Sequence, residues 1–516
     1  MTALSFRTAL VWSAASGALA LTWELCWSRL MNYAAAGQAE SFGLLLGFYL
    51  LGLALGSWGS TRWFGGLAAT DALAQVARLV VAGNVIAFLT APMAAWMYTV
   101  IPASVFLVRF VTMVPVAVSG VLFGVVFPLL CHWAVASGRF SGRDVSYLYV
   151  ANIIGAGAGS LLTGFVLFDH FGLVSLTVVV LVAGHLWAEW LAGGRLTTVW
   201  RVVPLAAALA TPLLTADLYA RLFYKRSWTP ERSFSQVLES RHGVLTVTPD
   251  AMLIGNGVYD SIIHNGLNPT TEHVRPYWLG AVHAAPRDVL VIGLASGTWT
   301  HVMANHPTVQ TMTAVEISAG YLDLVASRPE VSSLLRDPRV TLEVDDGRRW
   351  LRNHPERRFD VIMWNTYHWR EMSTGILSIE FLDLVKSRLK PGGIAMWNTT
   401  GSGRVVATGL RAFPHMVKFG GFVIGSMTPI DLDWDRWASV LAGYRIDGRP
   451  AFDQSTPEGV AALRDALALR DRQGTGFGSY YWLDHAQLTA THAHEAIITD
   501  DNLGREYRRW QDRFRR

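Results

Sequence analysis

Cysteine and lysine are scarce in this sequence. Only two cysteines occur among 516 residues, Cys26 and Cys131, and both lie in apolar segments. Two such cysteines supply neither a disulfide framework nor a cysteine-based zinc site, and we expect no metal. The first lysine is Lys225, so the N-terminal part lacks one of the commonest surface residues of soluble proteins.

Strongly basic regions and nucleic-acid motifs are also missing. The formal net charge is +4, and the most basic run is REYRRWQDRFRR, which begins at Arg505. A run of this kind is typical of a solvated helix end, and contact with anionic lipid is the alternative. No recognition motif accompanies it, so we expect no nucleic-acid partner.

Long apolar runs fill the N-terminal part instead. Hydrophobic residues make up 51% of the chain, and a bilayer core is crossed by roughly 20 apolar residues in a helix. The candidate spans are residues 8–27, 40–61, 79–98, 105–134, 146–168 and 171–192. A seventh candidate, 202–220, is interrupted by Pro204 and Pro212. We expect residues 1–220 to form a transmembrane helical domain of six to seven spans, with the lipid bilayer as its partner.

The first apolar run follows Arg7 without a small-residue cleavage site, so we expect a membrane helix and not a removed signal peptide. Small residues spaced four apart let helix backbones approach closely in lipid. Such pairs are Gly52 and Gly56, Gly120 and Gly124, and Gly155 and Gly159. The helices are therefore expected to pack as a compact bundle.

Few polar residues interrupt these runs. Glu24 is either a functional carboxylate at membrane depth or an interfacial residue paired with Arg29. Asn152 is expected to hydrogen-bond between helices. The scarcity of intramembrane charge disfavours a third interpretation of the whole bundle, a transporter of polyamines or other small molecules.

The side of the membrane on which the C-terminal part lies is ambiguous. Arginines concentrate in alternate loops: Arg62, Arg78, Arg139, Arg143, Arg195 and Arg201. The positive-inside rule makes these loops, and the N-terminus, cytoplasmic. Seven spans then put the C-terminal domain outside, whereas six spans with the proline-broken segment along the interface keep it in the cytoplasm.

The C-terminal part alternates between strand and helix patterns. Its predicted strands are VLVIG (289–293), TMTAVEI, VTLEV, FDVIMWN and IAMWNTT, separated by helix-like segments. This alternation predicts a doubly wound parallel sheet. Ligands bind such sheets at the carboxyl ends of the strands, which here carry Gly293, Glu316, Asp346 and Asn365.

These residues suit an adenosine ligand. A glycine after the first strand lets the backbone approach a ligand, and an acid at the end of the second strand accepts both ribose hydroxyls. The acid at the end of the third strand, Asp346, accepts an adenine amino hydrogen. The alternative is a fold that has kept its shape and lost its ligand.

The order of these motifs resembles the spermidine synthase (polyamine aminopropyltransferase) family, in particular its bacterial membrane-fused branch. The resemblance rests on SGALALTWELCWSRL and GFYLLGLALGS in the apolar half, and on ESRHGVLTV, PYWLGAVH, VLVIGLASG, DPRVTLEVDDGR, LKPGG and ITDDN in the other half. It implies a multi-pass α-helical bundle in the bacterial inner membrane, fused to an α/β Rossmann-like domain of the methyltransferase type. This domain would cover residues 221–516, with a β-hairpin region near 235–265 and a core near 286–425.

The resemblance implies an activity and residue roles. The family transfers an aminopropyl group from decarboxylated S-adenosylmethionine to an amine such as putrescine. By position, Glu316 would hold the ribose, Asp346 the adenine, and Gly293 and Gly297 would shape the cofactor turn. Tyr277 matches a tyrosine beside the polyamine channel.

Several positions depart from the family pattern. Ser296 stands where an aspartate faces the aminopropyl amine, Asp260 stands near the expected glutamine, and Asn365 occupies the position of the catalytic aspartate. An alkylammonium with a pKa of about 10.4 must lose a proton to attack carbon. Asparagine is no useful base. His368 lies close enough in sequence to substitute, and it is also an ordinary loop residue.

Glu371 and Asp345 are further candidates for a substitute base.

The sequence leaves two hypotheses about the function open. One is a membrane-integrated aminopropyltransferase with a small amine substrate. The other is a catalytically inactive scaffold or accessory subunit that binds membrane protein partners or a second copy of itself.

Overall fold

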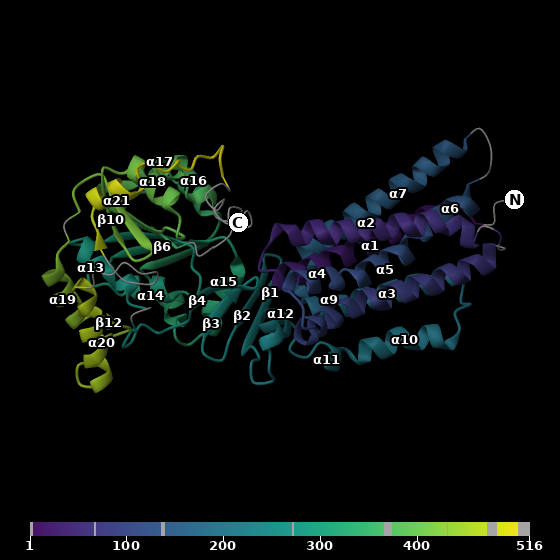
Figure 1. The fold of residues 1–516 in the computed structure, drawn as a ribbon, viewed down its shortest axis with the longest axis horizontal. Helices are drawn as coiled ribbons and strands as arrows, with labels where there is room; N and C mark the ends of the chain where they lie inside the picture. Colours follow the sequence, from purple (N-terminus) through teal and green to yellow (C-terminus); the bar gives the residue numbers. More distant parts are fainter. Residues whose placement is uncertain are drawn as a thin grey trace. The chain divides into compact units, whose positions relative to one another are not determined.

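The computed structural model describes residues 4–64, 66, 69–135, 140–270, 273–365, 374–430, 432–471 and 482–503. The chain divides into two compact units. The first, here the helical unit, comprises Met1–Asp250 and Ile254–Val258. The second, here the α/β unit, comprises Ala251–Leu253 and Tyr259–Arg516. Figure 1 labels the helices and strands of both.

Apolar helices with few breaks build the helical unit (Figure 1). Their bounds are α1 (Phe6–Ala34), α2 (Ala39–Phe64), α3 (Ala69–Val100), α4 (Val105–Thr112), α5 (Val114–Gly124), α6 (Val126–Ala134), α7 (Ser141–Leu162), the π-helical turn η1 (Thr163–Leu167), α8 (Phe168–His170), α9 (Leu173–Ala192), α10 (Thr198–Leu209), α11 (Thr211–Leu214), α12 (Leu218–Tyr224) and the 3₁₀ turn η2 (Lys225–Ser227). Gly193 ends α9 in the left-handed region, at φ +57°, which glycine adopts without strain.

The predicted apolar segments are helical. Within the described residues, six helical stretches are long and apolar enough to cross a membrane: Phe6–Ala34, Glu40–Phe64, Asp71–Val100, Val105–Ala134, Ser141–His170 and Leu173–Ala192. The proline-interrupted seventh segment forms a helix pair, Thr198–Leu209 and Thr211–Ser227, bent by 56°. The pair passes the same test only when counted as one span.

Two pairs of helices pack backbone to backbone through the predicted glycines. A side chain at Gly155 or Gly159 of α7 would collide with the carbonyl oxygens of Ala14 and Ala18 in α1, since a Cβ atom there would lie 1.9 and 2.5 Å away. Gly52 and Gly56 of α2 approach α5 in the same manner, at 2.2 and 2.0 Å. Close approach of this kind maximises dispersion contacts where no hydrophobic driving force acts between helices.

Polar side chains reinforce the contact between α1 and α7. Asn152 donates its amide hydrogen to the carbonyl of Ser13 at 2.9 Å, and the Ser13 hydroxyl donates to the carbonyl of Leu148 at 2.8 Å. The prediction that Asn152 bonds between helices is confirmed. Glu24 is buried, but the predicted pairing with Arg29 is wrong, because the carboxylate that pairs with Arg29 is Glu239.

Gly155→Val is expected to destabilise the helical unit. The branched side chain would be driven into the backbone of α1, and overpacking of this kind costs about 1–3 kcal/mol, or about 2–12 °C in melting temperature. Gly157→Val is the matched control, since a Cβ atom at Gly157 meets nothing within 4 Å. Thermal unfolding of both variants in detergent checks the prediction, and equal melting temperatures would contradict it.

The bent pair α10–α11 returns the chain along the length of the bundle. Arg201, near the start of α10, forms an ion pair with Glu189 at the end of α9. Tyr219 of α12 packs edge-on against Tyr33 at the end of α1, with ring centroids 4.8 Å apart. Residue 219 and the start of α1 therefore lie at opposite ends of the bundle. We call the end at Tyr33 and Tyr219 the hairpin end.

The helices hold a β-hairpin of strands β1 (Gln236–Ser240) and β2 (Gly243–Val247) at this end. Glu239 lies 3.7 Å from the Arg29 guanidinium and accepts hydrogen bonds of 2.8 Å from the Tyr219 hydroxyl and from the Leu173 amide. The Tyr33 hydroxyl is 2.9 Å from Thr246. The compact N-terminal unit consequently extends past residue 220 to Asp250.

β1 and β2 belong to a four-stranded sheet of order β1-β2-β3-β4, with β3 at Met252–Gly255 and β4 at Val258–Ile262. The division between the units runs through residues 250–259, so this sheet contributes to both.

The core of the α/β unit is a sheet of order β14-β10-β11-β9-β8-β5-β6-β7. Its strands are β5 (Asp288–Ile292), β6 (Thr311–Glu316), β7 (Val340–Val344), β8 (Phe359–Trp364), β9 (Leu389–Asn398), β10 (His415–Phe419), β11 (Phe422–Ser426) and β14 (Trp482–Leu483). The five predicted strands, β5 to β9, are present and parallel. β9, β11, β10 and β14 then pair antiparallel, so the sheet is mixed.

Helices and turns precede, connect and follow the strands of this sheet. Their bounds are η3 (Arg275–Trp278), α13 (Leu279–Val282), α14 (Thr298–Ala304), α15 (Ala319–Ser327), η4 (Ser332–Arg336), α16 (Gly347–Asn353), η5 (Thr374–Ile376), α17 (Ile379–Lys386), α18 (Gly403–Ala412), α19 (Trp434–Gly443), α20 (Pro457–Leu467), η6 (Ala468–Asp471) and α21 (His485–His492). A short hairpin, β12 (Arg445–Ile446) and β13 (Arg449–Pro450), follows α19. Trp364 and Trp397 stack in the core on adjacent strands, 5.1 Å apart and nearly parallel. These buried rings lie next to the strand ends that carry the candidate site.

Candidate functional site at the carboxyl edge of the sheet

Strand register brings the predicted residues to one edge. Ile292 of β5 pairs with Trp364 of β8 and with Val315 of β6, so the next residues, Gly293, Asn365 and Glu316, are neighbours. Gly293 has φ +90°, a conformation that side chains rarely adopt. A Cβ atom at Gly293 would have only the Asn365 carbonyl oxygen nearby, at 3.8 Å, so glycine is required here by conformation and not by crowding.

Glu316 is buried and held by backbone amides. Its two carboxylate oxygens accept hydrogen bonds from the amides of Leu294, at 2.7 Å, and Ser318, at 2.9 Å. Burial raises the pKa of the carboxyl, the two amides oppose this, and Asp260 adds to the rise. A carboxylate has about four acceptor positions, so an ionised Glu316 can still accept from two ligand hydroxyls.

A second carboxylate lies beside Glu316. Asp260 projects from β4 and accepts a hydrogen bond of 2.7 Å from the hydroxyl of Tyr321 in α15. Its charge acts on Glu316 as well as on Tyr321. The glutamine-like position predicted to contact substrate thus lies next to the carboxylate of the second strand, and the two acids make this corner of the site attractive to cations.

The turn after β5 is bonded to the end of β4. The Ser296 hydroxyl, which is buried, donates to the carbonyl of Ile262 at 3.2 Å or to Thr298 Oγ1 at 3.1 Å. The Thr298 hydroxyl lies 3.2 Å from the same carbonyl, and the Ser296 amide donates to the Ser261 hydroxyl. Ser296 therefore holds the turn in place, and Gly297, at φ +77°, starts α14.

Asp346 caps the helix that follows the third strand. Its carboxylate accepts from the amide of Arg349 at 2.8 Å, which leaves the second oxygen for other partners. Gly347 is required by packing, since a Cβ atom there would lie 2.3 Å from the side chain of Ile292. Two residues of the DDGR motif, Asp346 and Gly347, thus have structural roles at the start of α16, as a helix cap and as a packing contact.

Asn365 lies in a row of neutral amides. Its side-chain oxygen accepts from the amide of Asn398, the last residue of β9, at 3.2 Å. Asn398 in turn accepts from the backbone amide of Thr400 at 2.8 Å. Asn398 was not predicted as a site residue, although its position at the end of the next strand, in MWNTT, could have indicated it.

Comparison with known proteins agrees with this arrangement. A family model described as the spermine/spermidine synthase domain matches residues 278–402. A polyamine aminopropyltransferase of Mycobacterium tuberculosis is 26% identical over 363 residues, which cover 61% of this chain and 66% of that relative. Polyamine aminopropyltransferase 2 of Ralstonia nicotianae is 26% identical over 461 residues, covering 85% of this chain and 87% of the relative.

Residues 278–402 thus resemble the spermidine synthase domain, and the chain as a whole is similar to polyamine aminopropyltransferases. The Ralstonia alignment is too long to lie in the α/β unit alone, so the likeness extends into the helical unit. The alignment spans just under two thirds of the mycobacterial relative. Among solved structures, a probable spermidine synthase from Corynebacterium glutamicum is 17% identical, with a TM-score of 0.36, and the match covers 53% of this chain and 97% of that chain.

One other residue that the family pattern singles out, Tyr277, lies within the described part of the chain. Tyr277 is completely buried, its hydroxyl donates to the carbonyl of Gly266 at 2.5 Å, and its ring packs against Tyr444 and Phe452. His368, like Glu371, lies outside the described residues. The basic C-terminal run from Arg505 lies outside them too.

The ITDDN segment is bonded to the rim of the candidate site. Asp500 forms an ion pair with Arg348, which follows the DG of the third strand end, and accepts from the Ser378 hydroxyl at 2.7 Å. Arg348 also donates to the carbonyl of Gly375 at 2.9 Å. These bonds join the start of α16 and the ITDDN segment to residues 375–378, which lead into α17.

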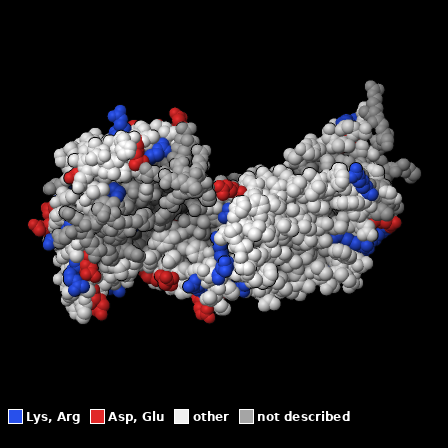
Figure 2. All heavy atoms as spheres, viewed as in Figure 1, with Lys and Arg blue, Asp and Glu red and all other residues white. Residues whose placement is uncertain are grey.

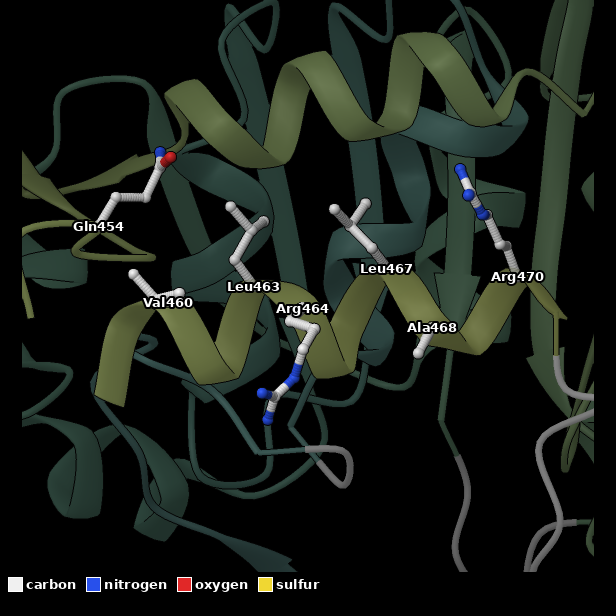
Figure 3. Close-up of a pocket in the computed structure, with 7 residues that line it drawn as sticks. All are labelled: Gln454, Val460, Leu463, Arg464, Leu467, Ala468 and Arg470. Atoms are coloured by element: carbon white, nitrogen blue, oxygen red, sulfur yellow. The ribbon is translucent and has the colours of Figure 1, made fainter. Parts of the chain in front are cut away.

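A surface hollow of about 430 Å³ lies elsewhere, along α20. Figure 3 shows the residues that line it, among them Leu463, Arg464 and Leu467 of this helix. None of the residues that line it belongs to the carboxyl edge of the sheet. Within the described ranges, no cluster of three His, Cys, Asp or Glu side chains is arranged to hold a metal ion.

Proposed function

We propose that the α/β unit binds decarboxylated S-adenosylmethionine and transfers its aminopropyl group to a small amine. The observation that carries this proposal is Glu316, a buried carboxylate fixed by the amides of Leu294 and Ser318 at a strand end. Its remaining acceptor positions suit two vicinal hydroxyls of a ribose. Asp346, with one oxygen engaged in capping, has a second oxygen for an adenine amino group.

The reaction breaks one bond and forms one. The amine nitrogen attacks the carbon next to the sulfonium, the carbon–sulfur bond breaks, and the amine loses a proton. The products are methylthioadenosine and the lengthened amine. Asp260 and Glu316 lower the energy of the cationic ligands in the site.

The residue at the position of the family's base limits the rate. Asn365 accepts a hydrogen bond from Asn398 but carries no charge and takes up no proton. Loss of a positioned general base costs about 10²–10⁴-fold. We therefore expect slow turnover, and the test is release of methylthioadenosine by the full-length protein in detergent with putrescine as acceptor. No release above background, with ligand binding intact, would reject the transferase.

A second candidate is an adenosyl-binding scaffold that performs no transfer and binds membrane partners. The observation that favours it concerns two residues that depart from the family pattern, because both are hydrogen-bonded to other protein groups. Ser296 is bonded to the end of β4, and Asn365 is bonded to Asn398. Intact binding without turnover is the result expected of this candidate.

Asn365→Asp alone is expected to raise turnover by far less than the roughly 10²–10⁴-fold contribution of a general base. The introduced carboxylate would keep the bond from Asn398, but Ser296 still faces Ile262 and supplies no charge. Asn398→Asp adds the same charge one strand away and is the control. Initial rates of methylthioadenosine release check this prediction, and a gain of 10²-fold or more from Asn365→Asp would contradict it.

We further propose that the helical unit spans the bacterial inner membrane seven times, with the α/β unit in the cytoplasm. Three observations support this: the six long apolar helices, the return of α10–α11 along the bundle, and a broad uncharged face with charged side chains at its ends (Figure 2). Adenosyl metabolites are cytosolic. The last part of the seventh pass and the segment after it add Arg221, Lys225, Arg226 and Arg232 to the hairpin end, which balances the arginines of the opposite loops.

Reporters active on one side of the membrane test this topology. We expect a C-terminal fusion to report the cytoplasm and an N-terminal fusion the outside. Reporters on the same side would contradict seven passes. A C-terminus outside would separate the α/β unit from its ligand and favour the scaffold.

A further inference from the structure

Four side chains from four separate elements meet at the hairpin end of the helical unit. Arg109 of α4 donates to the side-chain oxygen of Gln38, just before α2, at 2.9 Å. Tyr98, near the end of α3, is hydrogen-bonded to Arg109. Lys225, the first residue of η2, holds its ammonium group 5.7 Å from the centre of the Tyr98 ring. The fold thus brings together two cationic side chains, Arg109 and Lys225, that are far apart in the sequence.

Neither cation has a counter-charge among the described residues. Arg109 is only 8% exposed, and its Nε hydrogen is buried without a partner there. Lys225 is partly buried and lies close enough to Arg109 for the two charges to repel each other. In the part of the chain that the structure describes, no carboxylate forms an ion pair with either one. Buried charges in proteins are paired, because an unpaired ion loses its hydration without compensation.

We propose that this cluster of Gln38, Tyr98, Arg109 and Lys225 binds a phosphoryl anion. An arginine presents several N–H donors in a planar fork that matches two oxygens of a phosphate, and lysine adds a point charge. The Nε of Arg109 supplies a donor that no described protein group uses. Two positive charges suit an anion with several acceptor oxygens.

Two sources can supply this group. Tyr98 lies two residues from the end of α3, and Arg109 lies in the first helical turns of the next apolar stretch. This is the level of lipid headgroups if the bundle spans a bilayer, so the lipid source depends on the topology proposed above. A free phosphate is the other source, and it is independent of that topology.

The test compares the melting temperature of the full-length protein with and without the anion. One arm adds inorganic phosphate to protein in a neutral detergent, with chloride at equal ionic strength as reference. The other arm uses nanodiscs of phosphatidylglycerol mixed with phosphatidylcholine, against phosphatidylcholine alone. The variants are Lys225→Met and Arg109→Gln, with Arg226→Gln, an exposed neighbour of Lys225, as the charge-matched control.

The expected result is a change of sign for Lys225→Met. Without the anion this variant melts higher than the wild type, because the repulsion of Arg109 is relieved; with the anion it melts lower. Each cluster substitution weakens anion binding by about tenfold or more, whereas Arg226→Gln does not. A response to phosphate in detergent identifies a soluble ligand, and a response to phosphatidylglycerol alone identifies a lipid headgroup.

Two outcomes would overturn the proposal. One is the absence of stabilisation by either anion. The other is a shift of equal size in Lys225→Met, Arg226→Gln and the wild type, which would show a general effect of charge. Lys225 is less buried than Arg109, so Lys225→Met keeps the test available if Arg109→Gln fails to fold.

Discussion

Glu316→Gln is expected to weaken binding of decarboxylated S-adenosylmethionine by about 100-fold, since two hydrogen bonds to a charged acceptor lose most of their strength. The amide has one acceptor oxygen, whereas the carboxylate now receives the Leu294 and Ser318 amides on separate oxygens. Its NH₂ group would face one of these donors. The substitution therefore removes the charge and loosens the turn that shapes the site.

Glu343→Gln is the matched control for this experiment. Glu343 lies on the neighbouring strand β7 and accepts a hydrogen bond from Trp350 at 2.6 Å, which a glutamine oxygen accepts equally well. We expect the control to bind as the wild type does. Calorimetric titration of both variants measures the effect, and a dissociation constant for Glu316→Gln within about threefold of the wild type would exclude a ribose contact.

Glu239→Ala is expected to destabilise the helical unit by about 3–5 kcal/mol, because removing one partner leaves the other charge buried. The side chains of Arg29 and Glu239 are 7% and 13% exposed. The Tyr219 hydroxyl and the Leu173 amide would also lose their acceptor. Arg29 would keep the Ser240 carbonyl, the face of the Phe168 ring and the weaker attraction of Asp169.

Hydrogen exchange of the 236–247 segment separates local from global loss, since this hairpin is held by the same carboxylate. We expect its protection to fall in Glu239→Ala and to recover largely when Arg29→Met is added, because the unpaired charge is then gone. Arg241→Ala is the control on the same hairpin: its ion pair with Asp169 is 47% and 33% exposed, and such pairs contribute about 0–1 kcal/mol. Equal protection in both single variants would contradict the account.

Much of the fold was predictable because local patterns agree with it. The parallel strands are apolar runs that end in a glycine, an acid or an amide, and β5 to β9 were found in this way. The antiparallel strands β10, β11 and β14 were not predicted. β10 and β11 form a local hairpin, whereas its pairing with β9 and β14 joins residues more distant in sequence, such as Phe419 and Trp482.

The candidate site was predictable in its positions but not in its side-chain directions. The neighbours Gly293, Glu316 and Asn365 follow from strand order. The role of Ser296 does not, because its hydroxyl is directed by the Ile262 carbonyl, which another strand supplies. The predicted pairing of Glu24 with Arg29 failed for the same reason, because Arg29 bonds instead to a hairpin about two hundred residues away in the sequence.

The packing of the helical unit was predictable where a pattern has one physical meaning. Glycines four apart on an apolar helix signal close helix contact, and Gly155 and Gly159 do contact α1. The path of α10–α11 had no such signal. Pro204 and Pro212 mark a break, but only the contacts of Arg201 and Tyr219 reveal that the chain runs the length of the bundle.

The central claim is that the carboxyl edge of β5 and β6 is an adenosyl site. Calorimetric titration of the full-length protein in detergent with methylthioadenosine tests it most directly, because this ligand lacks the aminopropyl group and does not depend on Ser296 or Asn365. The account predicts saturable binding at one site per chain, lost in Glu316→Gln and kept in Glu343→Gln. Absence of binding by a protein that unfolds in a sharp thermal transition would contradict it.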